Sequence, residues 1–360
     1  MGGEPPGLTG GADTDMRIAV TGASSLIGTA LVELLRARGD DVVAFQRGRT
    51  RSPAVARVAG PNVETHLGDV SDAAAVDAAL ERCEVVVHLA AKVGVVGPRE
   101  EYVRTNIDGT RNVIAAARRH GARGVVHVSS PSVAHDGTPI VGGAASPPLD
   151  DHGVAWYPAT KAVAEKLALE TSDQRCAVVA IRPHLVWGPG DTQLVGRIIE
   201  RAESGRLALV AGGRALVDTT YVDNAASALL AAADAIRPGA VPAGRAYVVS
   251  NGEPRPIREL VAAICGAAGV PFEPYDVPLP VARRVGSLID MIWPRLGRDD
   301  EPPLTRFLAE QLGTAHWFDQ RAVRADLGWE PTVTIDEGIG ALAAWYAARA
   351  VEPRSDPSLA

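Results

Sequence analysis

The stretch MRIAVTGASSLIG, residues 16–28, decides the fold of this chain. An apolar run at 16–20 leads into the turn TGASSLIG at 21–28, and apolar residues then recur at helical spacing as far as Gly39. A second apolar run, DVVAF, follows at 41–45. Strand, glycine turn, helix and strand in this order predict a βαβ unit whose turn lies at the carboxyl edge of a parallel sheet, where ligands bind.

The turn carries two of the three glycines that a dinucleotide-binding turn usually has. Gly22 and Gly28 occupy the first and last positions, and the middle one is Ser25 or Leu26, depending on the spacing applied. Glycines in such a turn let the backbone reverse tightly and approach a pyrophosphate, and the following helix N-terminus attracts the anion. The βαβ context favours a phosphate-binding turn, in which the Ser25 hydroxyl can donate to a phosphate oxygen.

Alternating strand and helix patterns continue as far as residue 183. A run that is apolar throughout is typical of a strand covered on both faces, as in a parallel sheet. We predict strands at 83–91, 124–130 and 176–183 and helices at 103–121 and 160–170. The predicted fold class is α/β, with a doubly wound Rossmann parallel sheet.

The pattern loosens after Pro183, where Gly/Pro-rich loops separate shorter helices. We expect a dinucleotide-binding Rossmann domain at 16–185 and a smaller, discontinuous C-terminal substrate lobe at 186–350. Two segments of that lobe, about 214–237 and 316–349, are expected to return to the Rossmann body. Such a lobe would lay loops over the carboxyl ends of the strands, where substrates bind in open α/β sheets.

The composition excludes several classes of function. With 43 acidic and 36 basic residues the net charge is −7, which argues against a nucleic-acid partner. No apolar run approaches the roughly 18 residues of a membrane span, so a soluble cytoplasmic protein is predicted. Cys83, Cys176 and Cys265 lack the spacing of a metal site, and we expect no metal and three buried thiols. The ends, 1–15 and 351–360, are expected to be a disordered leader and tail.

Three residues form a candidate catalytic constellation. Tyr157 and Lys161 stand four apart in a helical pattern, so both can point into one cleft. A neighbouring ammonium favours the ionised phenol and is expected to lower the pKa of Tyr157, which makes it a usable proton donor and acceptor. Ser130 ends the strand at 124–130, where its hydroxyl can bond an oxygen on which charge develops. Ser129 is expected to face the opposite way and cap the strand.

Together with the glycine turn, these residues resemble an extended short-chain dehydrogenase/reductase. More narrowly, the chain resembles the group of 3β-hydroxysteroid dehydrogenases and sterol-4α-carboxylate 3-dehydrogenases, which includes bacterial 2-alkyl-3-oxoalkanoate reductases. The resemblance runs from Met16 to about Ala348. Its motifs are TGASSLIG, GDVSD, VHLAA, NIDGT, HVSSPSV, YPATK, IRPHLVWGPGD with QLV, VDTTYVDN and HWFDQRAVRADLGWEP. The departure is Ser25, where the family pattern has glycine.

The resemblance implies roles for individual residues. Ser130, Tyr157 and Lys161 would be the catalytic set, and Lys161 would also hold the nicotinamide ribose. Asp69 and Val70 would flank the adenine. The implied cofactor-binding residues as a whole are Gly22, Ser24, Ser25, Leu26, Ile27, Gly28, Arg47, Arg49, Asp69, Val70, Ala90, Ala91, Lys161, Pro183 and Leu185.

The end of the second strand bears on which dinucleotide binds. NAD enzymes usually present a carboxylate there to the ribose 2′-hydroxyl, whereas this chain has Gln46, Arg47, Gly48 and Arg49. Two guanidiniums can pair with a 2′-phosphate, so the pattern favours NADP(H), with NAD(H) as the alternative. The two arginines also fit solvated loop charges, and that interpretation stays open.

The candidate substrate contacts are Ser130, Tyr157, His184, Gln193 and Arg197. His184 fits a packed histidine as well as a catalytic one, and Arg197 fits either a carboxylate ligand or a surface arginine. Asn106 is either a helix residue bonded to nearby backbone or a residue that positions the active-site helix. Residues 277–297 carry apolar side chains at helical spacing, which favours a packed lobe helix over a hydrophobic lid or a lipid-contacting surface.

These observations predict an NADP(H)-dependent oxidoreductase that interconverts a 3-hydroxy and a 3-oxo group on a hydrophobic substrate, a steroid or a 2-alkyl-3-oxo acid. One alternative is a nucleotide-sugar epimerase with tightly bound NAD, because epimerisation uses the same tyrosine and lysine. Another is a non-catalytic NADP-binding sensor, which has no need for Ser130, Tyr157 and Lys161 together. A homodimer is expected from the resemblance, as helices beside the active site commonly pair in this family.

Overall fold

The centre of the molecule is a parallel sheet of seven strands. The computed structural model describes residues 16–48, 57–94, 97–151, 155–293, 302 and 304–351. The strands lie in the order β12-β7-β5-β4-β1-β2-β3 and every neighbouring pair is parallel. They are β1 (Arg17–Thr21), β2 (Asp41–Gln46), β3 (Val63–Leu67), β4 (Val85–His88), β5 (Gly124–Val128), β7 (Ala177–Pro183) and β12 (Ala246–Val249). The order reverses between β1 and β4, so a crevice opens there at the carboxyl edge.

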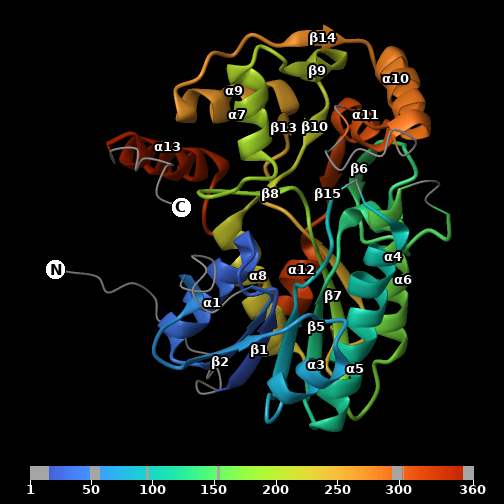
Figure 1. Ribbon diagram of the computed structural model, residues 1–360, viewed down its shortest axis with the longest axis vertical. Coiled ribbons are helices and arrows are strands. Elements are labelled where there is room, and N and C mark those ends of the chain that lie inside the picture. The colour runs from blue at the N-terminus through green and yellow to red at the C-terminus, as the bar shows by residue number, and fades with distance from the viewer. Residues whose placement is uncertain are drawn as a thin grey trace.

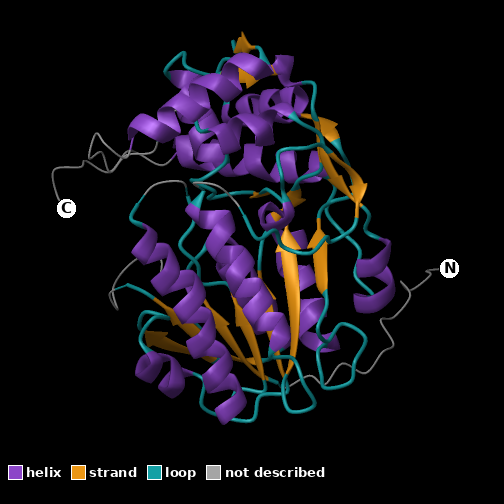
Figure 2. Ribbon diagram, turned by 90° about the vertical axis from the view of Figure 1, so that its right-hand side faces the viewer, coloured by secondary structure: helices purple, strands orange, loops and turns teal. Residues whose placement is uncertain are grey.

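Helices cover both faces of this sheet (Figures 1 and 2). Successive residues of each strand pack into different cores, because side chains alternate across a sheet. In β1, for example, Ile18 and Val20 join one core and Ala19 the other. The first core is closed by α1 (Leu26–Arg38), α8 (Val222–Ala235) and α12 (Arg321–Leu327), and the second by α3 (Ala73–Ala79), α5 (Gly109–Arg119) and α6 (Trp156–Glu170).

A group of helices and short strands lies beyond the carboxyl edge of the sheet, at the top of Figure 1. We call it the lobe: α7 (Val195–Glu203), β9 (Ala208–Val210), α9 (Ile257–Ala268), β14 (Tyr275–Val277), α10 (Leu279–Ile292) and α11 (Arg306–Gly313). Short strands connect it to the body: β6 (Ile140–Gly143), β15 (His316–Phe318), β10 (Leu216–Val217) and β13 (Arg255–Pro256) form one small sheet, and β8 (Val186–Trp187) pairs with β11 (Thr220–Tyr221). Helix α13 (Ile335–Val351) packs against α9.

The α/β doubly wound fold predicted from the sequence is confirmed, and the differences are local. The helix predicted at 160–170 begins at Trp156, so Tyr157 lies in its first turn. The helix predicted at 103–121 is present as a π-helical segment, Val103–Asp108, followed by α5, and the short α4 (Arg99–Tyr102) precedes it. Strands β3 and β12 have no counterpart in the prediction. β3 mixes exposed and partly buried residues and lacks the continuous apolar run of a central strand, whereas β12 is apolar but spans only four residues between Gly/Pro-rich loops.

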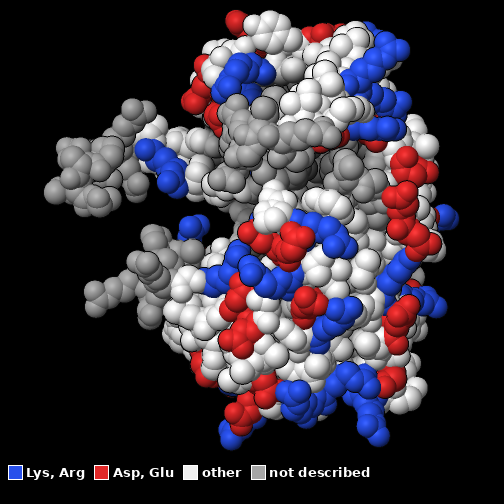
Figure 3. All heavy atoms as spheres, turned by 45° about the vertical axis from the view of Figure 1, so that its right-hand side comes forward, with Lys and Arg blue, Asp and Glu red and all other residues white. Residues whose placement is uncertain are grey.

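The surface carries charges of both signs. On the face drawn in Figure 3, basic and acidic side chains are interspersed over the body. Within the described ranges, no helix combines the length and the apolar character that a membrane span needs.

Candidate active site

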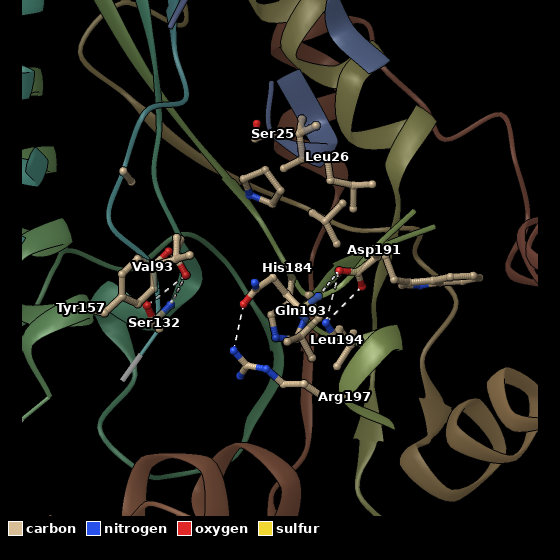
Figure 4. Close-up of a pocket in the computed structure, with 18 of the residues that line it drawn as sticks. Ser25, Leu26, Val93, Ser132, Tyr157, His184, Asp191, Gln193, Leu194 and Arg197 are labelled. Carbon is tan, nitrogen blue, oxygen red and sulfur yellow. Dashed lines mark hydrogen bonds between the residues drawn. The ribbon is translucent and has the colours of Figure 1, made fainter. Parts of the chain in front are cut away.

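One cavity of about 1090 Å³ lies at the carboxyl edge of the sheet and extends into the lobe. Figure 4 shows part of its lining, with the glycine turn on one side and Tyr157 and Arg197 on two others. Most of the residues predicted from the sequence line it: Gly22, Ser24, Ser25, Leu26, Ile27, Arg47, Asp69, Val70, Ala90, Ala91, Ser130, Tyr157, Lys161, Pro183, His184, Leu185, Gln193 and Arg197. Gly28 lies behind the turn and does not line the cavity, and Arg49 lies outside the described residues.

The glycine turn is built around two close approaches. Gly22 has φ +71°, and a Cβ at this position would lie 2.9 Å from the backbone nitrogen of Ala90, at the end of β4. A Cβ on Gly28 would lie 2.4 Å from the Gly22 carbonyl oxygen. Ser25, in contrast, has ordinary extended angles (φ −71°, ψ 166°), and its side chain accepts a hydrogen bond from the Gly28 N–H as the N-cap of α1. The serine therefore replaces glycine without backbone strain.

The residues at the end of β2 suit the adenosine half of a dinucleotide. Gln46 is buried and lines the cavity, yet neither its amide oxygen nor its amide nitrogen has a partner among the described residues. A buried amide without a partner is costly, so the side chain fits a site that a ligand completes. Arg47 lies near Asp69. Burial raises the pKa of Asp69, but hydrogen bonds from Ser71 and the charge of Arg47 outweigh it and hold that pKa below its usual value.

Ser130 and Tyr157 contact each other in the cavity. The Ser130 Oγ accepts hydrogen bonds from the Ser132 N–H at 3.2 Å and from the Ser132 hydroxyl at 2.9 Å. Its own proton is therefore directed away from Ser132, and it forms a hydrogen bond with the Tyr157 phenol. Sequence reasoning missed Ser132, although the spacing in SSPS could have indicated it. Ser129 also lines the cavity, and its hydroxyl bonds to no described residue, so the expectation that it caps the strand is wrong.

Lys161 is buried, and its ammonium is directed to the backbone of β5. Its Nζ donates to the Val128 carbonyl oxygen at 2.7 Å and lies 3.5 Å from Nε2 of His127. Burial lowers the pKa of Lys161 to about 8, while Glu165 opposes this shift. Burial raises the pKa of Tyr157, and the opposing influence comes from Ser130. The predicted lowering of the Tyr157 pKa by Lys161 is therefore absent from this structure, because the ammonium is directed to the backbone.

Asn106 joins the π-helical segment to the active-site helix. Its amide oxygen accepts from the Lys92 N–H at 2.7 Å, and its amide nitrogen donates to the Lys92 carbonyl and to Oγ1 of Thr160, at 3.1 and 3.0 Å. Thr160 precedes Lys161 on α6. Of the two interpretations left open, these contacts favour the residue that positions the active-site helix.

Residues 183–185 form the wall between the sheet and the lobe. His184 Nδ1 lies 2.6 Å from the Asp218 carbonyl oxygen and donates to it, so Nε2 carries no proton in the neutral ring. Burial lowers the pKa of His184 to about 4, and the imidazole is therefore neutral at physiological pH. Leu185 has φ +43°, an unusual angle for a residue with a branched side chain. Such strain is typical of functional sites.

Arg197 on α7 and Gln193, two residues before that helix begins, both line the cavity. Arg197 Nη2 donates to Oε1 of Gln193 at 2.9 Å (Figure 4). The helix begins under the carboxylate of Asp191, which accepts from the backbone N–H groups of Gln193, Leu194 and Val195. The hydrogen bonds of the Asp191 carboxylate thus go to backbone N–H groups at the start of α7.

The segment 277–297 differs from the preferred prediction of a packed helix. Helix α10 buries Ala282 and Gly286 against its neighbour α11, while the apolar stripe recognised in the sequence, Val281, Val285, Leu288 and Ile292, is exposed by 42 to 53%. The stripe faces outward because the helix packs through its small residues. The cavity wall is formed by α11, and the last residues of the segment, 294–297, lie outside the described residues.

Comparison with known proteins gives the family. Residues 19–280 match the model of the 3-beta hydroxysteroid dehydrogenase/isomerase family. The chain belongs to this family. It is 45% identical to a 2-alkyl-3-oxoalkanoate reductase of Stenotrophomonas maltophilia, over 92% of this chain and all of that protein. It is 30% identical to a 3-beta-hydroxysteroid dehydrogenase of Mycolicibacterium neoaurum, over 92% of each chain.

This membership confirms the predicted extended short-chain dehydrogenase/reductase group and shows that the chain is an enzyme of the dehydrogenase/reductase type. Solved structures share the fold at lower identity. The Bordetella bronchiseptica enzyme WbmH in complex with NAD+ has a TM-score of 0.71 at 22% identity, covering 93% of this chain and 99% of that one. A UDP-glucuronic acid 4-epimerase from Bacillus cereus in complex with NAD has a TM-score of 0.71 at 19% identity, covering the same shares.

Proposed function

We propose that this enzyme interconverts a 3-hydroxy and a 3-oxo group on a hydrophobic substrate with NADP(H), using Ser130, Tyr157 and Lys161. The observation that carries the proposal is that these three side chains line the same cavity as the glycine turn. The bound nicotinamide would supply the hydride in reduction and accept it in oxidation. The residues of the chain then have two tasks, which are to transfer a proton to or from the substrate oxygen and to stabilise the negative charge that develops on it.

In reduction, the substrate ketone oxygen lies where both hydroxyls can reach it. Tyr157 donates its proton to that oxygen as the alcohol forms, and Ser130 donates a hydrogen bond that stabilises the developing negative charge. Ser132 supports this role because its two donations to Ser130 Oγ leave the Ser130 proton for the substrate side. In oxidation each transfer runs in reverse.

We propose that Lys161 stabilises the Tyr157 phenolate once the proton has left, and so lowers the pKa of Tyr157, only when its ammonium turns toward the phenol in the cofactor complex. A pKa of about 8 keeps its ammonium mostly protonated at neutral pH, and a buried positive charge stabilises a nearby anion strongly. In the resting structure the ammonium bonds to the Val128 carbonyl. We propose that it shares its remaining protons with the ribose of the bound cofactor, as the family resemblance implies.

The end of β2 supports NADP(H) over NAD(H). The side chain there is the neutral amide of Gln46, which, unlike a carboxylate, does not repel a 2′-phosphate, and Arg47 lines the cavity beside it. The nicotinamide dinucleotide itself is supported by the glycine turn and by structural neighbours solved with NAD.

The lobe half of the cavity supports a hydrophobic substrate. Its walls include Ile198 on α7, Leu260 and Ile264 on α9, and Leu308 and Leu312 on α11. Apolar walls with few polar groups are typical of sites for lipid-like ligands. The names of the relatives, a 2-alkyl-3-oxoalkanoate reductase and 3-beta-hydroxysteroid dehydrogenases, point the same way.

A substrate screen tests this function. NADPH oxidation would be followed with steroids and 2-alkyl-3-oxo acids, and NADP+ reduction with the matching alcohols. We expect turnover that Tyr157→Phe reduces by at least about a hundredfold, because the acid group is lost while the ring stays packed. Turnover of a UDP-sugar without added cofactor would instead identify an epimerase, and NADPH binding without any turnover would identify a sensor.

A further inference from the structure

Strand β5 carries a polar side chain within an apolar run. The other residues of Gly124–Val128 are glycine and valine, and His127 is fully buried among them. Its Nε2 lies 3.5 Å from Nζ of Lys161, and its Nδ1 has no partner among the described residues. Lys161 lines the cavity and His127 does not, so the imidazole lies behind the lysine as seen from the ligand. Burying an imidazole with one nitrogen unpaired is costly and calls for an explanation.

The protonation of His127 follows from its surroundings. Burial and the positive charge of Lys161 lower the pKa of His127 well below its usual value, so the imidazole is neutral. A neutral imidazole donates at one ring nitrogen and accepts at the other. An ammonium only donates, so Nε2, which faces Lys161, is the acceptor and Nδ1 carries the proton.

The neighbouring His88 does not compete for the lysine. Its ring centroid lies 5.6 Å from that of His127. The Thr110 hydroxyl donates to a backbone carbonyl at 2.6 Å, so it accepts from Nε2 of His88 at 3.0 Å. Nδ1 of His88 then accepts from the Thr21 hydroxyl at 2.7 Å. Neither nitrogen of His88 is available to Lys161.

The ammonium of Lys161 has three N–H groups to place in a buried site. One donates to the Val128 carbonyl oxygen at 2.7 Å, and His127 Nε2 is the second acceptor within reach. Glu165 follows one turn later on α6, but Arg182 binds both of its carboxylate oxygens. The third N–H group is left for the cavity that Lys161 lines.

We propose that His127 is a positioning residue for Lys161, whose ammonium donates to the imidazole Nε2 and thereby stays charged in its buried site with an N–H group left for the ligand. The inference rests on the proposed function, because it concerns the lysine of that catalytic set. It goes further by assigning a role to a residue that touches neither substrate nor cofactor. The imidazole stays neutral, and no proton is transferred to it.

The pH dependence of reduction should reveal this acceptor. With one acceptor fewer, the charged form of Lys161 is less stable, so its pKa falls below the value of about 8 to which burial already lowers it. Reduction needs a charged Lys161 and a protonated Tyr157. Because burial raises the pKa of Tyr157, the rate falls as the pH rises through the lower pKa, that of Lys161. Loss of the acceptor therefore moves this fall to lower pH.

The surroundings of Lys161 contain few other groups that titrate or carry charge. Those on the elements packed around it are Tyr157 and Glu165 on α6, His127 on β5, His88 on β4 and Arg182 on β7. Glu165 and Arg182 form a buried ion pair, and both histidines are neutral at physiological pH. The fall in rate near pH 8 is therefore assigned to Lys161.

The kinetic test compares His127→Leu with the wild type in the NADPH-dependent reduction of the methyl ester of a 2-alkyl-3-oxo acid. The ester has no carboxylate that titrates and does not lose carbon dioxide. We expect the fall in kcat to move down by about one pH unit. The variant would then be about five- to tenfold slower at about pH 8 and above, and within about threefold of the wild type at about pH 6.5. An unmoved profile would overturn the inference.

Two variants separate the acceptor from the packing of the strand. His127→Gln places an amide oxygen near the position of Nε2, and we expect it to restore most of the profile. Val125→Ala removes a buried side chain on the same face of β5, outside the cavity lining, and we expect lower stability with an unmoved profile. Equal shifts in His127→Gln and His127→Leu, or a shift in Val125→Ala, would overturn the inference.

A spectroscopic measurement on the wild-type enzyme needs neither turnover nor a stable variant. In protein labelled with ¹⁵N at histidine, the chemical shifts of the ring nitrogens report which one carries the proton. We expect a protonated Nδ1 and an unprotonated Nε2 in His127 at neutral pH. The Nε2 signal should change as Lys161 titrates at about pH 8, and Lys161→Met should abolish this change.

The tautomer also keeps the inference separate from the proposed function. A proton on Nε2 of His127 at neutral pH would overturn the inference even if turnover is observed. The expected tautomer in a protein that reduces no ketone would contradict the proposed function alone.

Discussion

The Ser132 hydroxyl, 2.9 Å from Ser130 Oγ, is a residue-scale feature with a measurable effect. In Ser132→Ala, Ser130 loses one of its two donors and its proton is no longer directed to the substrate side. A neutral hydrogen bond of this kind contributes about 1 kcal/mol. We expect kcat to fall about three- to tenfold, with the Kd for NADPH unchanged. Ser204→Ala, at an exposed serine outside the cavity, is the matched control. A change in NADPH affinity comparable to the change in kcat would contradict this role.

Arg47 gives a second prediction at the same scale. Arg47→Asp places a carboxylate next to the ribose of a bound dinucleotide, where it accepts from a 2′-hydroxyl and repels a 2′-phosphate. We expect the ratio of kcat/KM with NADPH to that with NADH to fall at least about tenfold. Arg111→Asp, at an exposed residue on α5 outside the cavity lining, controls for the change in net charge. If the ratio does not move, the arginine is only a solvated charge.

At the scale of elements, helix α7 depends on Asp191 for its position. The carboxylate is 7% exposed and accepts from three successive backbone N–H groups at the start of the helix. In Asp191→Ala these donors lose their partner, and we expect a loss of about 1–2 kcal/mol in the free energy of unfolding. Because α7 also carries Arg197, KM should rise more than kcat falls. Denaturant unfolding and steady-state kinetics check the two effects, with Asp191→Asn as the conservative comparison.

How much of the molecule the sequence predicts also differs from element to element. The central strands could be located because their apolar runs are continuous, and Tyr157 and Lys161 could be grouped because residues four apart share a helical face. The direction of the Lys161 side chain could not be predicted from the sequence. Its partner is the Val128 carbonyl, a backbone group that no pattern of side chains reveals. The outward-facing stripe of α10 was misassigned for a related reason. Periodicity locates a helical face, but packing through Ala282 and Gly286 decides which face is buried.

At the scale of the whole molecule, several buried histidines make folding sensitive to acid. Burial lowers the pKa of His88 and His316 to about 3 and that of His184 to about 4, and also lowers the pKa values of His127 and His135. In the unfolded chain these groups titrate near 6.5. Below that pH the unfolded state binds more protons than the folded state, so stability is lost as the pH falls. Asp218, whose pKa burial raises to about 6, opposes this trend between roughly pH 4 and 6.

We therefore expect the free energy of unfolding to be constant near neutral pH and to decrease by several kcal/mol between about pH 6.5 and 5. Urea unfolding across this range measures it. His135→Leu offers the sharpest comparison, because both ring nitrogens of His135 are buried without a partner among the described residues. This variant should be more stable than the wild type at pH 5 and show a shallower dependence on pH. A steeper dependence would rule out His135 as one of the responsible groups.

The two halves of the cavity come from separate stretches of the chain. Residues that precede β8 line the half with the glycine turn, Ser130 and Tyr157, and residues from Asp191 onward line the lobe half. Libraries that randomise only positions of the lobe half, such as Leu260 and Leu308, can therefore change which substrate chain lengths are accepted while coenzyme affinity is preserved. The same separation suits grafting, in which the lobe residues of a relative replace those of this protein to obtain a hybrid biocatalyst with new selectivity.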